Sequence, residues 1–189
     1  FNFFITFNRL YWWQRMNNIF NIFGFQLSWW GCVLGVKYDM VYLGPVLMAT
    51  FLILHFTFIS SNYSEIKLII LFGLAGTLID TSMAFFRVLE YNGTYTQDTV
   101  IAPLWITSMW CGFSATVNHS LAWLKKRYFA SIVLGAFSGP LSYLAGVKFE
   151  AIHFISSPAV SLGIIALFYS FAIPLMYWVN EKLVLEIQS

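Results

Sequence analysis

Charged side chains are scarce in this chain: aspartate, glutamate, lysine and arginine make up only 10% of its 189 residues. A soluble domain carries about 25% charged residues, because it needs them to cover a water-exposed surface. Hydrophobic residues fill 59% of the positions, and the mean hydropathy is +0.73. These proportions exclude an ordinary soluble domain and predict a protein that folds inside a lipid bilayer.

Several chemical signatures are missing as well. The two cysteines, Cys32 and Cys111, show no CxxC or Cys/His spacing and fall in different predicted spans, so neither a metal site nor a disulfide is predicted. The net charge of +2 is too small to indicate a nucleic-acid partner. No GxSxG, HExxH or phosphate-binding-loop motif occurs. The sequence therefore predicts no metal and no cofactor, and it leaves open whether the protein is an enzyme.

What is present is a series of six long apolar stretches with short connectors. A bilayer core about 30 Å thick is crossed by about 20 helical residues. We therefore expect an all-α fold, a polytopic bundle of six transmembrane helices over residues 19–184, preceded by an interfacial segment at residues 1–18. The predicted spans are Ile19–Val36, Met40–Ser60, Ile66–Leu89, Val100–Leu124, Tyr128–Val147 and Pro158–Val179.

The lysines and arginines are shared unevenly between the two sides of this bundle. With the N-terminus inside, seven of them are cytoplasmic, and the run Lys125–Arg127 is the strongest marker. Only Lys37, Arg87 and Lys148 fall on the other side. The positive-inside rule therefore predicts that both termini are cytoplasmic, an N-in/C-in topology.

Small residues recur at helical spacing in four of the spans. In lipid they allow backbones to approach closely, because apolar side chains gain nothing by leaving an apolar solvent. These stripes predict helix–helix contacts. Their glycines include Gly31, Gly35, Gly73, Gly76, Gly112, Gly135 and Gly139.

Asp80 is an ionisable side chain well inside the third predicted span, on its small-residue face. Such a group costs about 2.5–3.5 kcal/mol on insertion scales, so it has to be protonated, paired or hydrated. Arg87 follows two turns later, close enough to the surface for its side chain to reach water. Two interpretations have equal weight: Asp80 carries a proton or anchors a ligand, or it is an inter-helix hydrogen-bonding group.

Histidines form a second group of candidates. His119, beside Asn118, lies near the cytoplasmic end of the fourth predicted span, and His55 lies at about the same depth in the second. Imidazole can shuttle protons or ligate a metal, and two histidines at one depth could be axial haem ligands. The favoured interpretation is that both are hydrogen-bonded structural or substrate-contact groups. Gln26, His55, Asn118 and His119 are expected to converge, with Asp80 deeper.

Aromatic residues are abundant, with 20 Phe, 10 Tyr and 8 Trp. Most are expected to face lipid or to pack between helices. Those near the polar candidates would suit an elongated apolar ligand such as an acyl chain. They are Trp29, Trp30, Trp105, Trp110 and Trp123.

Several short motifs distribute along most of the chain. They are FQLSWWGCVLG (Phe25–Gly35), LGP (Leu43–Pro45), GTLID (Gly76–Asp80), APLW (Ala102–Trp105), FSATVNHSLAWL (Phe113–Leu124) and LGAFSGPLSYLAG (Leu134–Gly146). Together they resemble domain-of-unknown-function family 2878, a bacterial inner-membrane family without an established activity. The resemblance implies a multi-pass protein of the bacterial inner membrane, and the family's association with genes that modify membrane fatty acids favours a lipid. The family motif positions fall on Gln26, Trp29, Asp80, Asn118, His119, Pro140 and Tyr143.

The sequence is compatible with three functions. The leading hypothesis is an inner-membrane protein that binds or helps to process a lipid or another hydrophobic small molecule, with a membrane protein partner or a second copy of itself. A small proton-coupled transporter and a non-catalytic scaffold subunit are the alternatives. The candidate ligand-binding residues are Gln26, Trp29, His55, Asp80, Asn118, His119 and Tyr143.

Overall fold

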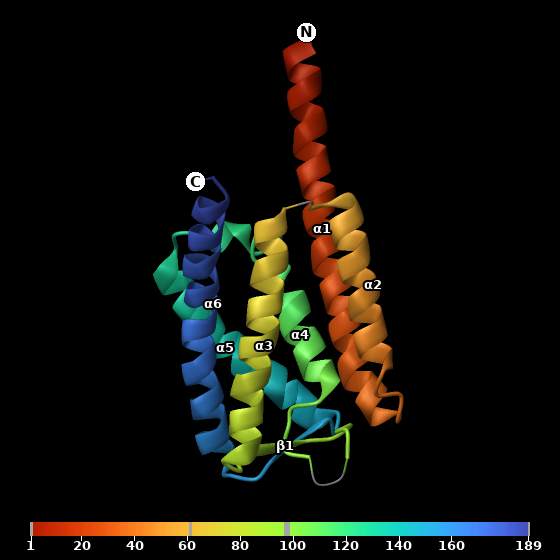
Figure 1. Cartoon of the computed structure of the whole chain (residues 1–189), viewed down its shortest axis with the longest axis vertical. Coiled ribbons are helices and arrows are strands. Elements are labelled where there is room, and N and C mark those ends of the chain that lie inside the picture. Colours follow the sequence, from red (N-terminus) through yellow and green to blue (C-terminus); the bar gives the residue numbers. More distant parts are fainter. Residues whose placement is uncertain (1, 61, 97–98, 189) are drawn as a thin grey trace.

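The computed structural model describes residues 2–60, 62–96 and 99–188, with side chains over 14–60, 62–96 and 99–184. This part of the chain forms six α-helices and two short strands (Figure 1). The expected all-α, six-helix fold is confirmed. The elements are α1 (Asn2–Lys37), α2 (Leu43–Phe58), α3 (Tyr63–Phe85), β1 (Leu89–Tyr91), α4 (Leu104–Ser114), the 3-10 turn η1 (Ala122–Leu124), α5 (Tyr128–Lys148), β2 (Ile152–Phe154) and α6 (Pro158–Gln188).

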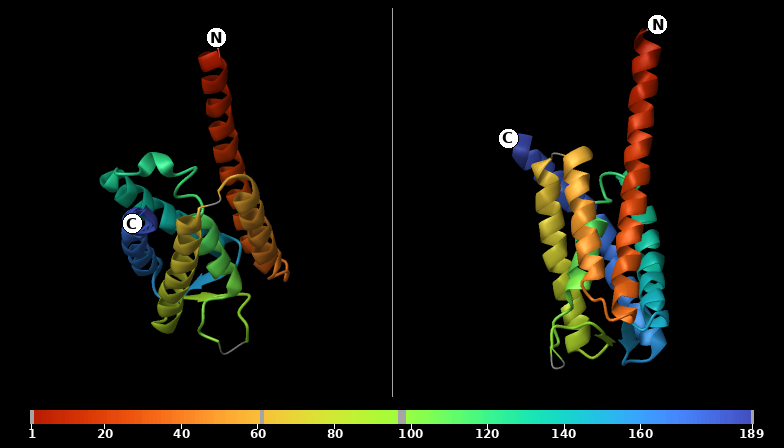
Figure 2. Two further views of the ribbon diagram at one scale, coloured as in Figure 1. Left: turned by 45° about the horizontal axis from the view of Figure 1, so that its top comes forward. Right: turned by 90° about the vertical axis from the view of Figure 1, so that its right-hand side faces the viewer.

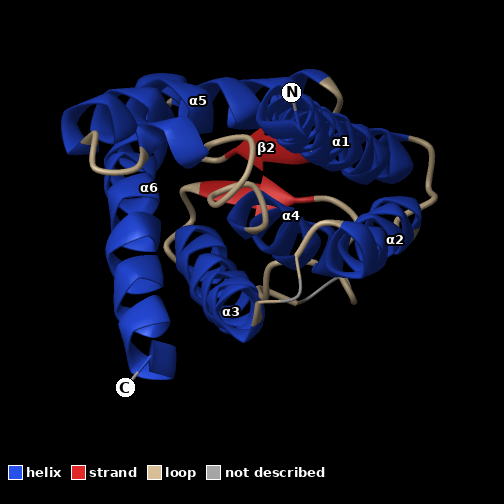
Figure 3. Cartoon of the chain, turned by 90° about the horizontal axis from the view of Figure 1, so that it is seen from above, coloured by secondary structure: helices blue, strands red, loops and turns tan. Residues whose placement is uncertain are grey.

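Successive helices run in alternating directions, so both termini lie at the same end of the bundle (Figure 1). Seen along the bundle, α4 lies at the centre (Figure 3), where it packs on α1, α2 and α3. α1 pairs with α2, and α6 packs on both α3 and α5. The short fourth helix is therefore enclosed by the longer ones, which explains why much of its surface is buried.

Glycines bring neighbouring helices together where the sequence predicted contacts. A Cβ at Gly76 of α3 would lie 2.1 Å from the Trp110 ring of α4. A Cβ at Gly135 of α5 would lie 2.0 Å from the Tyr169 carbonyl oxygen of α6. Any larger residue would force these backbones apart. The predicted close contacts through the third and fifth spans are confirmed.

Four helices are long and apolar enough to cross a bilayer: α1 from Gln14, α3, α5, and α6 as far as Val184. These four helices indicate a multi-pass membrane protein. The 16-residue α2 is shorter, and the 11-residue α4 extends for only about 16 Å. The prediction of one continuous span over Val100–Leu124 is wrong, because α4 ends at Ser114 and turns follow.

The predicted interfacial segment, residues 1–18, falls largely within α1. This helix begins at Asn2 and continues without a break to Lys37, and its first part extends beyond the rest of the bundle (Figure 2). The side chains of residues 1–13 lie outside the described part of the chain. An interfacial position of this segment therefore stays a prediction.

The turns after α4, residues 115–121, are called the turn segment below. Irregular backbone at membrane depth is tolerated where protein groups satisfy its polar atoms. Asn21 of α1 does this from one side: its Nδ2 donates to the Ala115 carbonyl at 3.0 Å, and its Oδ1 accepts from the Ser120 hydroxyl at 2.6 Å. Asn21 has no exposed surface, so water does not compete for the hydrogen bonds between its amide and the turn segment.

Helix α6 holds the turn segment from the other side. The Asn180 and Asn118 side chains form a reciprocal amide pair, with N···O distances of 2.7 and 3.2 Å. The Tyr177 hydroxyl donates to the Leu121 carbonyl. Three side chains of α1 and α6 thus fix a stretch whose own backbone bonds are those of turns, such as His119 N–H to the Thr116 carbonyl.

The opposite end of the bundle contains a β-ribbon that the sequence did not predict. β1 and β2 pair antiparallel, with Glu90 opposite His153. α3 and α5 reach these strands through equivalent turns, in which Arg87 and Glu150 adopt left-handed conformations with φ of 55° and 61°. α3 therefore ends before Leu89, where its span was predicted to end, and β1 carries Tyr91 beneath the helices.

Candidate functional site

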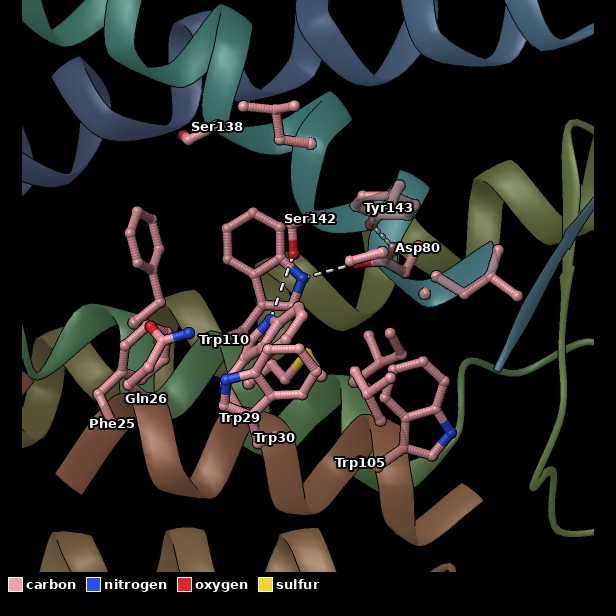
Figure 4. Close-up of a pocket in the computed structure, with 18 of the residues that line it drawn as sticks. Phe25, Gln26, Trp29, Trp30, Asp80, Trp105, Trp110, Ser138, Ser142 and Tyr143 are labelled. Atoms are coloured by element: carbon pink, nitrogen blue, oxygen red, sulfur yellow. Dashed lines mark hydrogen bonds between the residues drawn. The ribbon is translucent and has the colours of Figure 1, made fainter. Parts of the chain in front are cut away.

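A pocket of about 420 Å³ lies between α1, α4 and α5 (Figure 4). Its walls are mainly aromatic: Trp29 and Trp30 come from α1, and Trp105 and Trp110 come from α4. The sequence analysis named these four tryptophans as candidates for contact with an apolar ligand, and all four line the same pocket. Trp123, the fifth of that group, lies outside the pocket and is 55% exposed.

Two contacts link α1 to α5 and to Phe149, the residue that follows α5. Trp29 Nε1 donates to Ser142 Oγ at 3.2 Å, and the Trp30 and Phe149 rings meet edge to face with centroids 5.4 Å apart. Trp30 is nevertheless 38% exposed and Leu141 of α5 is 65% exposed, although both line the pocket. The pocket therefore opens outward between α1 and α5, on the outer surface of the bundle.

Asp80 of α3 lies at the inner wall of the pocket and is completely buried. Its Oδ1 accepts hydrogen bonds from the Tyr91 and Tyr143 hydroxyls, and its Oδ2 accepts one from Trp110 Nε1 at 2.6 Å. These three donors belong to β1, α5 and α4. A single carboxyl group therefore connects four elements of the fold.

The partners of Asp80 are neutral groups. Burial, followed by the charge of Asp80, raises the pKa of Tyr91 well above its usual value of about 10. The Tyr91 hydroxyl is therefore protonated at neutral pH and can act as a donor. Arg87, which the sequence placed near Asp80, is exposed beyond the end of α3.

A second polar cluster lies at the other end of α3, around Glu65. Glu65 Oε1 lies 3.1 Å from His55 Nε2 and 3.0 Å from His119 Nε2. Glu65 Oε2 accepts a hydrogen bond from the Ser60 hydroxyl. His55 and Glu65 are 0% and 2% exposed, whereas the His119 side chain is 16% exposed. The group therefore combines two imidazoles and a carboxylate in a mostly buried place.

The seven candidate residues separate into different places. Four of them line the pocket: Gln26, Trp29, Asp80 and Tyr143. His55 and His119 meet at Glu65, with ring centroids 4.7 Å apart, and Asn118 pairs with Asn180 instead. Glu65 and Asp80 lie fifteen positions apart in α3, about 22 Å along the helix axis. The predicted convergence holds for the two histidines, while Gln26 belongs to the other site.

Comparison with known proteins assigns the chain to a family. Residues 18–175 match the family described as Protein of unknown function (DUF2878). The chain belongs to this family. The match, which the sequence motifs had predicted, includes α2 to α5 and all seven candidate residues and leaves the first 17 residues outside. No curated protein matches the chain, and no solved structure matches it.

The sequence of this DUF2878 chain did not predict the roles of two residues, Glu65 and Tyr91. Glu65 lies just before the predicted third span, at the depth of His55 and His119, and that shared depth was the available signal. Tyr91 lies in a polar loop, where nothing in the sequence indicates that β1 returns it to Asp80. The first could have been found by comparing depths, but the second required the tertiary structure.

Proposed function

We propose that this protein binds a lipid or another elongated hydrophobic molecule in the pocket between α1, α4 and α5. In this proposal it is a multi-pass protein of the bacterial inner membrane that holds the molecule for processing, together with a membrane protein partner or a second copy of the chain. The observation that carries the proposal is an aromatic pocket that opens on the outer surface of an apolar helical bundle.

The size and lining of the pocket suit such a ligand. Small-molecule sites usually measure about 300–1,000 Å³ and combine apolar walls with a few polar groups that fix orientation. The pocket of about 420 Å³ lies within this range. Its polar groups include the Gln26 amide and the Ser138 and Ser142 hydroxyls, which Figure 4 shows around the tryptophans. We assign the apolar part of the ligand to the aromatic walls and its polar end to these three side chains.

The mouth of the pocket supports entry from the bilayer. Trp30 and Leu141 line the pocket and are also exposed on the outer surface of α1 and α5. A hydrophobic molecule could therefore move sideways between these helices without crossing water. The Trp29–Ser142 hydrogen bond at 3.2 Å is a single polar contact that such a molecule would displace.

Binding accounts for the geometry better than proton-coupled transport does. A proton relay through Asp80 and the histidines would need a chain of polar groups between them. Asp80 is instead bonded to three donors, and it lies about 22 Å along α3 from Glu65. The neutral donors around Asp80 favour its second interpretation, an inter-helix hydrogen-bonding group that shapes the pocket wall.

Quenching of tryptophan fluorescence by fatty acids with brominated chains tests the proposal, because four tryptophans line the pocket. The purified protein in detergent is titrated with a brominated acid and then with its unbrominated analogue as competitor. We expect saturable quenching that the competitor reverses. Ser138→Phe should weaken this binding at least tenfold, because the added ring occupies the pocket.

Leu144→Phe is the matched control, because it adds a ring to the same helix at a residue that is 41% exposed and outside the pocket. It should bind like the wild type. Quenching that does not saturate, or that Ser138→Phe and Leu144→Phe alter equally, would refute the pocket. Proton-dependent uptake of a solute into liposomes containing the protein would favour the transporter.

A further inference from the structure

We propose that His55, Glu65 and His119 form a binding site for a divalent transition-metal ion such as Zn²⁺. The three residues come from the end of α2, the start of α3 and the turn segment, so only the fold brings them together. The site uses none of the pocket residues. The metal-site proposal is therefore independent of the proposed lipid binding.

The distances in the cluster fit metal coordination. The three residues can each offer one ligand atom, and these atoms all lie within 4.8 Å of one another. Zn²⁺ binds imidazole nitrogen and carboxylate oxygen at about 2.0–2.1 Å, which places neighbouring ligands of a tetrahedral site about 3.3 Å apart. The two nitrogens lie 3.1 and 3.0 Å from Glu65 Oε1. The three ligand atoms are bounded only by 4.8 Å, so the two imidazoles would move toward each other by up to about 1.5 Å to admit the ion.

The ligand types narrow the choice of ion. Imidazole favours zinc, iron, copper, cobalt and nickel over magnesium or calcium, which prefer oxygen ligands. Two histidines and one carboxylate are three protein ligands, and metal sites of this composition keep a position for water or another small ligand. His119, whose side chain is 16% exposed, provides the access from outside.

The charge of Glu65 is compatible with a bound cation. A buried carboxylate is costly unless an opposite charge or several hydrogen bonds accompany it. Within the described part of the chain, Glu65 is contacted by the His55 and His119 imidazoles and by the Ser60 hydroxyl, which already accompany this carboxylate with hydrogen bonds. A divalent ion between the three residues would compensate the carboxylate and leave both imidazoles neutral.

The surroundings hold the ligands in place. Ser60 donates to Glu65 Oε2 and so orients the carboxylate, as hydrogen-bond partners of metal ligands do. The Phe51 and Phe56 rings flank His55, with centroids 5.8 and 5.3 Å from the imidazole. His119 is positioned because the turn segment that carries it is bonded to α1 and α6.

A hydrogen-bonded network without metal is the competing explanation. Two neutral imidazoles that donate Nε2–H to Glu65 Oε1 would show the same distances. His55 Nδ1 is buried and has no hydrogen-bond partner among the described residues, so it is an unpaired acceptor in that case and an unpaired donor with a metal on Nε2. This atom therefore does not distinguish the two explanations, and a direct measurement is needed.

The experiment measures metal uptake by the full chain in detergent. The protein is stripped with a chelator, equilibrated with Zn²⁺ and analysed by mass spectrometry of the metal. We expect one Zn²⁺ per chain at micromolar free metal. Co²⁺ in place of Zn²⁺ should give visible ligand-field absorption, which reports nitrogen and oxygen ligands around the ion.

Variants assign the ion to the cluster. His119→Ala and Glu65→Gln should each lower the Zn²⁺ affinity about 100-fold or more, because each removes a ligand. His119→Cys should retain the ion and add a thiolate charge-transfer band to the Co²⁺ spectrum, which a structural role of His119 would not produce. His153→Ala is the control, because His153 is an exposed histidine on β2 at the far end.

The outcomes are distinct. If the stripped wild-type protein takes up no Zn²⁺ at about 100 µM, the site does not exist, whatever the variants do. Uptake that His119→Ala and Glu65→Gln leave unchanged would place the ion elsewhere and also overturn the proposal. Failure of fatty-acid binding with intact Zn²⁺ uptake would remove the pocket function and leave this site in place.

Discussion

Asp80 shows how a single residue can be costly in a membrane helix and still be stabilising. Its two oxygens accept hydrogen bonds from Tyr91, Tyr143 and Trp110, all of which are buried. Each of these donors would also be unsatisfied in an apolar environment, so the carboxylate and its partners depend on one another. The sequence identified Asp80 as exceptional but gave neither of the tyrosines as its partners.

Asp80→Asn should therefore lower stability. An amide replaces one of the two accepting oxygens with an NH2 donor, so at least one of the tyrosine or tryptophan donors loses its acceptor. We expect a loss of about 1–3 kcal/mol in the free energy of unfolding, measured by denaturation in mixed micelles. Asp39→Asn, at an exposed turn, should have little effect. Equal stability of Asp80→Asn and the wild type would contradict this role.

At the scale of single elements, α4 and the turn segment after it are the most informative. The apolar stretch Val100–Leu124 has the length and hydropathy of a span, and hydropathy cannot reveal where a helix inside it ends. The break at Ser114 is possible because Asn21, Asn180 and Tyr177 satisfy the backbone and side chains that follow. These partners are distant in sequence, so the break could not be predicted from the stretch itself.

Asn21→Ala should destabilise the turn segment. The change leaves the Ala115 carbonyl and the Ser120 hydroxyl without their partner in a buried place. We expect a loss of about 2–4 kcal/mol in unfolding free energy and faster hydrogen exchange in residues 115–121. Asn18→Ala, an exposed asparagine on the same helix, is the control and should match the wild type. Unchanged exchange in Asn21→Ala would show that the segment holds without this amide.

At the scale of the whole molecule, composition and periodicity were enough for the helical class, the number of helices and several of their contacts. The small-residue stripes work as predictors because close backbone approach requires them locally, as at Gly76 and Gly135. The β1–β2 ribbon and the pocket depend on how distant segments meet. No local sequence pattern encodes contacts between distant segments, so the ribbon and the pocket could not be predicted from the sequence.

The orientation in the membrane is the prediction at this scale. The structure places both termini at one end, and the positive run Lys125–Arg127 favours the cytoplasm for that end. In a variant with Cys32 and Cys111 changed to alanine, a membrane-impermeant maleimide should label Tyr95→Cys in spheroplasts. Lys125→Cys should react only after permeabilisation. The reverse pattern would place the termini outside.

The β1–β2 ribbon has a consequence for how this fold can diverge. It joins the ends of α3 and α5 through main-chain hydrogen bonds, which most side chains can maintain. The end with the termini depends on individual groups such as Asn21 and Asn180. Among distant relatives, loops at the ribbon end should therefore vary more in length than the opposite end, except at positions such as Tyr91 and Asn92, whose side chains bond Asp80 and the Glu150 carbonyl.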